Sequence, residues 1–136
     1  MGAVEFTDIF ENMSEDRKFN LVKNENTSSK ILERLAHDND WRVRLYVAKN
    51  PNTTVNILEK LASDKDETVK KFVTQNPNTS IDILERLAND EDMYVSECAT
   101  KTLSNNKEYN DLNEEFNNMV KDLKKNQQKS DFKEQL

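Results

Sequence analysis

Residues 50–75 read NPNTTVNILEKLASDKDETVKKFVTQ, and the same 26-residue pattern stands directly before and directly after them. The three units span residues 24–49, 50–75 and 76–101, and 11 of their 26 positions carry the same residue in all three. A fixed period of this length is the sequence signature of stacked supersecondary units. We therefore predict that consecutive units stack into a solenoid that offers a surface rather than a reaction centre.

Each unit is expected to form two short antiparallel helices. In the middle unit, Ile57, Leu58 and Leu61 recur at three-to-four spacing and mark one buried face of the first helix. Val69 and Val73 mark the second helix, which ends at an Asn-Pro pair because proline disfavours a helical residue before it. We expect the first helices to be capped by Thr27, Thr53 and Thr79, and the second helices by Asp40, Asp66 and Asp92.

The composition agrees with a well-solvated helical domain, since the 136 residues include one Gly, two Pro and 34% charged side chains. The net charge is −6, and residues 1–23, 24–101 and 102–136 carry −2, −3 and −1. The absence of a basic region disfavours tight, nonspecific binding of nucleic acid. The single cysteine rules out an internal disulfide, and no apolar stretch is long enough for a signal peptide or a membrane span. We therefore expect a cytoplasmic protein.

Residues 1–23 are predicted to be a divergent capping unit at the N-terminal end of the stack. A shift of 26 residues places Phe6 and Ile9 at the positions of Leu32 and Leu35. A repeat unit cannot bury its apolar face alone, so the first unit of a stack needs such a cover.

The C-terminal region is predicted to contain one longer amphipathic helix. Apolar residues alternate there in steps of three and four, at Tyr109, Leu112, Phe116, Met119 and Leu123. The segment 102–124, with its helix at about residues 108–124, is interpreted as a C-terminal cap. The alternative is that this helix forms a dimer seam. Because the cap is favoured, we expect a monomer rather than a homodimer. Residues 125–136 lack apolar periodicity and are expected to be disordered.

The repeat resembles the variant leucine-rich repeat family of bacteria and is similar to the broader HEAT-like repeats. The resemblance rests on Asn-Pro-Asn-Thr, Ile-Leu-Glu-Arg/Lys-Leu-Ala, Asp-x-Asp and the valine-rich second half, and it covers residues 24–101. It implies an all-α, right-handed superhelix of short helices with one curved face, in which the second half-unit is an α- or a 3₁₀-helix. Some members carry an iron–sulfur cluster on a cysteine-rich N-terminal segment, but residues 1–97 contain no cysteine, so that property does not carry over.

No catalytic or metal-binding arrangement is predicted. His37 is the only histidine, so neither a histidine metal pair nor a triad can be assembled. Cys98 occupies the position of Tyr46 and Phe72, which indicates a small buried hydrophobe. The Asp-x-Asp turns lack the glycine and the distal glutamate of a calcium loop, and helix capping explains them. We expect no cofactor and no enzymatic activity.

Variation between the units indicates a binding surface. On a helical wheel centred on the buried valines of the second helix, positions 41, 45 and 48 point outward and position 44 lies on the flank. Unit one places Trp41 and Leu45 there, a pair typical of an interface anchor. The alternative is that Trp41 packs on the N-terminal unit, where Phe19 takes the position of Leu45. The predicted partner-binding residues are Trp41, Arg42, Arg44, Leu45, Lys70, Lys71 and Met93.

The sequence thus favours a non-enzymatic protein-interaction scaffold that holds a partner protein on its second-helix face. One alternative is a nucleic-acid-binding module that uses the cluster of Arg and Lys on that face. The other is an acidic inhibitor or mimic that presents Asp38, Asp64 and Asp90 to a basic partner.

Overall fold

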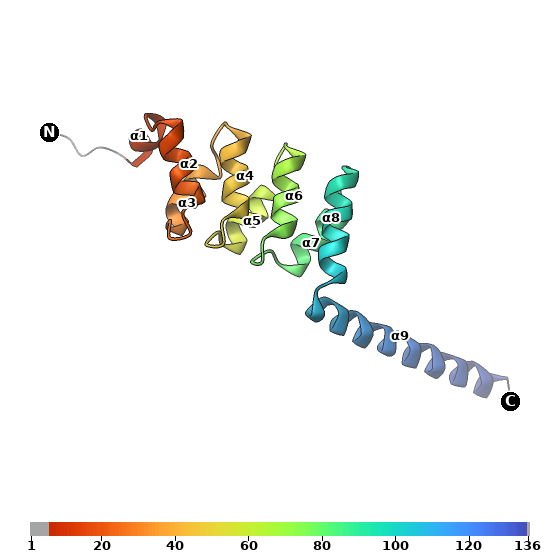
Figure 1. Cartoon of the computed structure of the whole chain (residues 1–136). Coiled ribbons are helices and arrows are strands. Elements are labelled where there is room, and N and C mark those ends of the chain that lie inside the picture. Colours follow the sequence, from red (N-terminus) through yellow and green to blue (C-terminus); the bar gives the residue numbers. More distant parts are fainter. Residues whose placement is uncertain (1–5, 136) are drawn as a thin grey trace.

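The computed structural model describes residues 6–135, with side chains from Ile9 onward, and this part of the chain forms nine α-helices and no strand (Figure 1). The helices are α1 (Phe6–Glu11), α2 (Glu15–Lys23), α3 (Ser29–Leu35), α4 (Trp41–Lys49), α5 (Val55–Leu61), α6 (Glu67–Gln75), α7 (Ile81–Ala88), α8 (Met93–Ser104) and α9 (Lys107–Glu134). The all-α prediction is confirmed. The second half of each unit is an α-helix, which decides between the two forms that the resemblance allows.

The helices α2, α4, α6 and α8 form one layer, in which each helix contacts the next along the row (Figure 1). The first helices of the units form the other layer, because α3, α5 and α7 each pack against the helix that follows them. Each unit therefore adds one helix to each layer, and α1–α8 together make up the body of the molecule.

The core lies between the two layers and runs without interruption from the N-terminal unit to unit three. The repeated leucines of the first helices are at most 2% exposed: Leu32, Leu58 and Leu84. The repeated valines of the second helices are fully buried: Val43, Val69 and Val95. Burial of each such side chain stabilises the fold by about 1.5–3 kcal/mol relative to its exposed state.

The second helices begin as predicted, but the first helices begin one residue later. Asp40, Asp66 and Asp92 are the N-caps of α4, α6 and α8, and each carboxylate accepts a hydrogen bond from the first turn. The N-caps of α3, α5 and α7 are Ser28, Thr54 and Ser80 rather than the preceding threonines.

The invariant threonines have a different role. The hydroxyls of Thr27, Thr53 and Thr79 donate hydrogen bonds of 2.6 Å to the carbonyls of Leu21, Val47 and Val73. These carbonyls lie in the last turn of the preceding second helix, where each also accepts the N–H of the asparagine that ends the helix. Each threonine therefore fixes the start of one unit to the end of the helix before it.

The N-terminal unit differs from the prediction in the register of its first helix. Residues 12–14 join α1 to α2, whereas residues 36–40 join α3 to α4, so the turn is shorter. As a result Phe10 is buried, whereas Ile9 is 47% exposed, and the predicted equivalence of Ile9 and Leu35 is wrong. The side chain of Phe6 lies outside the described residues.

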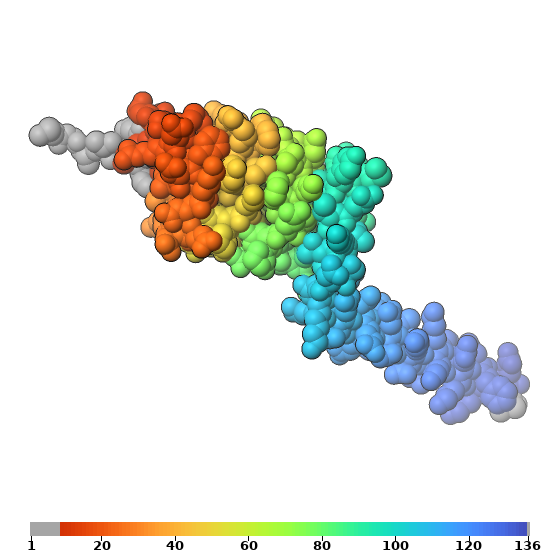
Figure 2. Space-filling view, viewed as in Figure 1, coloured from red at the N-terminus to blue at the C-terminus, as the bar shows by residue number. Residues whose placement is uncertain are grey.

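The helix α9 departs most from the prediction. It is a single helix of 28 residues without a buried residue, and it projects away from the body (Figures 1 and 2). Within the segment 102–124, Leu103 is buried on α8, but residues 107–124 of α9 do not cover the last unit as a cap would. Residues 125–134 continue the same helix instead of forming the expected disordered tail.

Polar residues close the C-terminal end of the stack instead. Ala48, Thr74 and Thr100 occupy the same position in the three units. Ala48 and Thr74 are fully buried, so the prediction that position 48 points outward is wrong. Thr100, which has no following unit, is exposed. Ser96 stands where earlier units carry a cation, and its hydroxyl donates to the carbonyl of Ala88 in its own unit at 2.8 Å. A terminal unit with a polar outer face keeps the core of a stack from being exposed.

Candidate interaction surface

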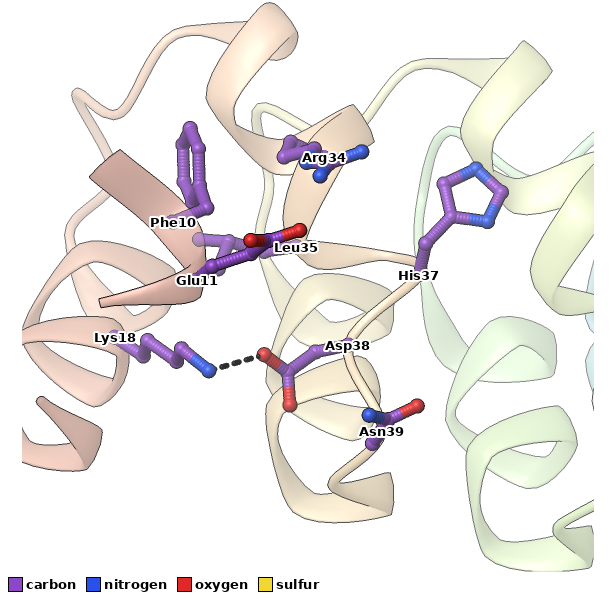
Figure 3. Close-up of a pocket in the computed structure, with 8 residues that line it drawn as sticks. All are labelled: Phe10, Glu11, Lys18, Arg34, Leu35, His37, Asp38 and Asn39. Carbon is purple, nitrogen blue, oxygen red and sulfur yellow. Dashed lines mark ion pairs between the residues drawn. The ribbon is translucent and has the colours of Figure 1, made fainter. Parts of the chain in front are cut away.

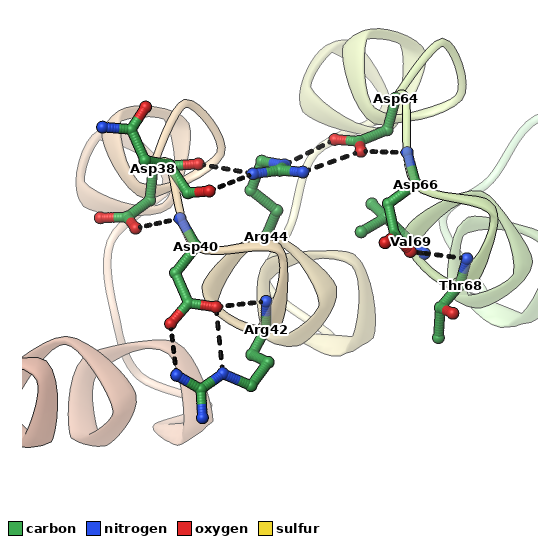
Figure 4. A network of polar contacts seen from close by, with 9 residues as sticks. Asp38, Asp40, Arg42, Arg44, Asp64, Asp66, Thr68 and Val69 are labelled. Carbon is green, nitrogen blue, oxygen red and sulfur yellow. Dashed lines mark hydrogen bonds and ion pairs between the residues drawn. The ribbon is translucent and has the colours of Figure 1, made fainter.

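A row of ion pairs joins each unit to the next on the side of the Asp-x-Asp turns. A cation near the start of one second helix meets the first aspartate of the following turn, with N–O distances of 2.7–2.8 Å, in Lys18–Asp38, Arg44–Asp64 and Lys70–Asp90. The Arg44–Asp64 pair is the most buried of the three, with side chains 7% and 8% exposed. The Arg44 guanidinium also donates to the carbonyls of Asp38 and Asn39 (Figure 4).

The protonation equilibria follow from these contacts. The hydrogen bond to Asp38 raises the pKa of Lys18, and the hydrogen bond to Asp64 raises the pKa of Arg44. Burial is the largest influence on Asp90 and favours its neutral form, but the Lys70 ammonium and the Asp92 N–H together outweigh burial and lower the pKa of that carboxyl.

A hollow of about 360 Å³ lies beside the first of these pairs (Figure 3). Lys18 and Asp38 meet across it, while the imidazole of His37 points away from them. Lys18 and Asp38 are thus already bound to each other, and Glu11 and Arg34 are the other charged residues that line this hollow. The first aspartate of each Asp-x-Asp turn pairs with a cation of the preceding unit, and the second caps the helix that follows.

A second row, of asparagines, holds the other end of the units together. The Asn50 amide donates to the carbonyls of Val22 and Asn24 at 2.8 and 3.0 Å, and the Asn76 amide donates to those of Ala48 and Asn50 at 2.7 and 3.0 Å. Buried polar groups need such partners, since an unpaired one costs about 1–3 kcal/mol. The repeated asparagines are therefore structural.

A cluster of aromatic and cationic side chains lies on the outer side of α2 and α4. The rings of Phe19 and Tyr46 meet edge to face with centroids 6.0 Å apart. The Lys23 ammonium lies 4.9 Å from the Tyr46 centroid, and the Arg42 guanidinium lies 5.5 Å from the Phe19 centroid. Trp41 stands beside them with 44% of its surface exposed.

These side chains surround a hollow of about 390 Å³, which is lined by Phe19, Lys23, Trp41, Arg42, Leu45 and Tyr46. The cluster continues onto α6, because the Lys49 ammonium lies 5.4 Å from the Tyr46 centroid and 5.2 Å from that of Phe72. We call this set, the six lining residues with Lys49 and Phe72, the second-helix surface. Cations above aromatic faces are held there by the ring quadrupole.

The structure brings together three of the predicted site residues, Trp41, Arg42 and Leu45. Arg44 is buried in its ion pair and Lys70 is bound to Asp90, so neither belongs to the exposed surface.

The two remaining predicted residues lie on later helices, outside this hollow. Lys71 is half-buried on α6, and Met93 is 64% exposed on α8.

Sequence reasoning missed five members of the surface: Phe19, Lys23, Tyr46, Lys49 and Phe72. A signal was present: a lysine recurs at position 49 of the N-terminal unit and unit one, and an aromatic residue recurs at position 46 of units one and two. Position 46 was assigned to the core because it is always apolar. Tyr46 and Phe72 are in fact half-buried, so their rings serve both the core and the surface.

Comparisons of the chain with models of protein families, with curated proteins and with solved structures found no match. Among the described residues, no three His, Cys, Asp or Glu side chains are grouped so that they could hold a metal ion. No helix over residues 6–135 combines the length and the apolar character needed to cross a membrane.

Proposed function

We propose that this chain is a non-enzymatic protein-interaction module of the cytoplasm. In this proposal the stacked units form a right-handed helical-repeat solenoid of the variant leucine-rich or HEAT-like kind, and the partner binds the second-helix surface. The observation that carries the proposal is the hollow of about 390 Å³ between Trp41, Phe19 and Tyr46. Aromatic residues and arginine around a pocket are the composition of an interface hot spot.

The charges at this hollow define the partner. Lys23, Arg42 and Lys49 lie at its edge or over its aromatic rings. A matching segment inserts one large apolar side chain between Trp41 and Tyr46 and carries carboxylates on either side of it. Such complementary charge speeds association and selects against basic segments.

The two alternative functions have less support. Arg44 and Lys70 each form an ion pair that joins two units, with Asp64 and Asp90 respectively. A nucleic-acid backbone would have to compete with these carboxylates, and an acidic mimic would have to withdraw the same aspartates from the units they join. A salt titration of RNA or DNA binding tests the first alternative, because phosphate contacts give a steep dependence on salt.

Peptide display against the whole chain tests the proposed function. Selected peptides are expected to share a large apolar residue flanked by Asp or Glu. Their binding can be followed directly, because Trp41 is the only tryptophan of the chain and lies at the hollow, so its emission reports occupancy. Peptides in which the carboxylates are replaced by amides serve as the matched controls.

The proposal requires that the acidic peptides change Trp41 emission and that the amide versions bind at least about 10-fold more weakly at low salt. Selection of basic peptides, or acidic binders that leave Trp41 emission unchanged, would place the binding site elsewhere.

A further inference from the structure

The helix α9 carries an apolar stripe that the chain itself leaves uncovered. The stripe consists of Leu112, Phe116, Met119 and Leu123, which are 52%, 62%, 58% and 66% exposed. Their alternating steps of four and three residues place them along one side of the helix. A 28-residue helix without buried residues gains nothing from tertiary packing, which is what stabilises most helices in proteins.

The charges of α9 are separated along its length. Residues 108–118 contain four acidic side chains and no basic one, whereas residues 121–133 contain five lysines and two aspartates. The two stretches therefore carry −4 and +3. The helix dipole favours such an order only in the first and last turns, so it does not account for Glu114, Glu115, Lys121 or Lys124.

We propose that α9 pairs in antiparallel orientation with α9 of a second copy of this chain. Antiparallel pairing places the −4 stretch of each helix beside the +3 stretch of the other. Parallel pairing would place like charge beside like charge along the whole seam. The inference does not rest on the proposed function, because α9 shares no residue with the second-helix surface.

The apolar stripe fixes the register of this pair. Phe116 of each copy lies opposite Met119 of the other, and Leu112 lies opposite Leu123, so all four residues of both helices are covered around a two-fold axis. Residues 107–128 then overlap over about 33 Å, at 1.5 Å per residue. The two bodies lie at opposite ends of the helix pair, and residues 129–134 of each helix reach past the start of the partner's α9.

The flanking side chains are balanced in this register. It places Glu108 beside Lys129 of the other copy and Glu115 beside Asp122, so by symmetry the seam contains two complementary and two like-charge contacts. The antiparallel orientation therefore rests on the opposite net charges of the two stretches. The seam is short and has few apolar layers, so we expect a dissociation constant in the micromolar range, at the weak end for specific pairs.

Sedimentation velocity of the whole chain from about 5 to 500 μM tests the pairing. The mass should rise from the 15.9 kDa of the monomer toward twice that value, and Phe116→Asp should remain monomeric throughout. The control Asn117→Asp adds the same charge beside the stripe and should still dimerise. A wild-type chain that stays monomeric, or a Phe116→Asp variant that dimerises as the wild type does, would overturn the proposal. A different partner for α9 would then have to be sought.

The orientation is tested by disulfide formation in a Cys98→Ser background, which removes the only native thiol. Leu112→Cys and Leu123→Cys chains should cross-link efficiently when mixed and poorly when each is alone. Efficient cross-linking of each variant with itself would show a parallel pair and contradict the charge argument. The circular dichroism of the body should be unchanged in every variant, because α9 contributes no buried residue.

Discussion

The change Asp64→Asn should destabilise the protein because it leaves a buried arginine without its counter-charge. Asp64 accepts two hydrogen bonds from Arg44, at 2.8 and 3.1 Å, and the two side chains are 8% and 7% exposed. Asparagine can still accept the 2.9 Å hydrogen bond from the Asp66 N–H, so the turn itself is kept. The variant therefore removes the charge and one of the two acceptor oxygens that Arg44 uses, while the turn is kept.

The size of the effect follows from what Arg44 loses and keeps. Removing one partner of a buried pair costs about 3–5 kcal/mol, and each charge-assisted hydrogen bond accounts for about 1.5–3 kcal/mol. The guanidinium keeps the carbonyls of Asp38 and Asn39, so we expect the lower end, about 3 kcal/mol.

Urea unfolding, followed by circular dichroism, measures this cost. The matched control is Glu33→Gln, which also removes a carboxylate from an inter-unit ion pair, with Lys60, but at side chains about half exposed. The control should cost much less, because an ion pair between exposed side chains contributes little to stability. Equal costs for the two variants would refute the claim that burial makes the Arg44–Asp64 pair critical for stacking.

Three further outcomes are expected. Because the folded-state pKa of Asp90 lies below its ordinary 3.8, the free energy of unfolding should be constant from about pH 5 to 8 and fall as the pH drops below 4. The change Asp90→Asn should make the free energy of unfolding depend less on pH below pH 4, as measured by unfolding curves at each pH. Asn50→Ala should cost about 2 kcal/mol, because the buried carbonyl of Val22 and the partly buried carbonyl of Asn24 each lose a donor, whereas Asn24→Ala at the exposed start of the row should cost under about 1 kcal/mol. Deletion of residues 107–136 should leave the melting temperature of the body within about 2 °C, and a large loss would show that α9 does cover the stack.

The repeat made most of the body predictable from the sequence. The buried leucines and valines follow from helical periodicity, and the aspartate caps follow from the fixed spacing of Asp-x-Asp before each second helix. The threonines were misplaced by one residue, because both members of the Thr-Ser/Thr pair are good N-caps and the sequence does not say which hydroxyl meets the previous helix.

The errors at the surface arose from contacts between units. A helical wheel treats one helix alone, so it put position 48 toward solvent and Arg44 on the flank, although both are buried. For α9, periodicity predicted the helix but not its direction. Whether the stripe folds back onto unit three or points to solvent depends on the short turn at Asn105–Asn106, which carries no apolar signal.

Calorimetric titration of one display-selected acidic peptide into Trp41→Ala and Val55→Ala tests the central claim most directly. Trp41 and Val55 are both 44% exposed, but only Trp41 lines the hollow of the second-helix surface. We expect Trp41→Ala to weaken binding by about 30-fold or more, as for an interface anchor, with a stability loss of about 1 kcal/mol. Val55→Ala should bind as the wild type does. Equal affinities of the two variants for the peptide would contradict the assignment of this surface as the partner-binding site.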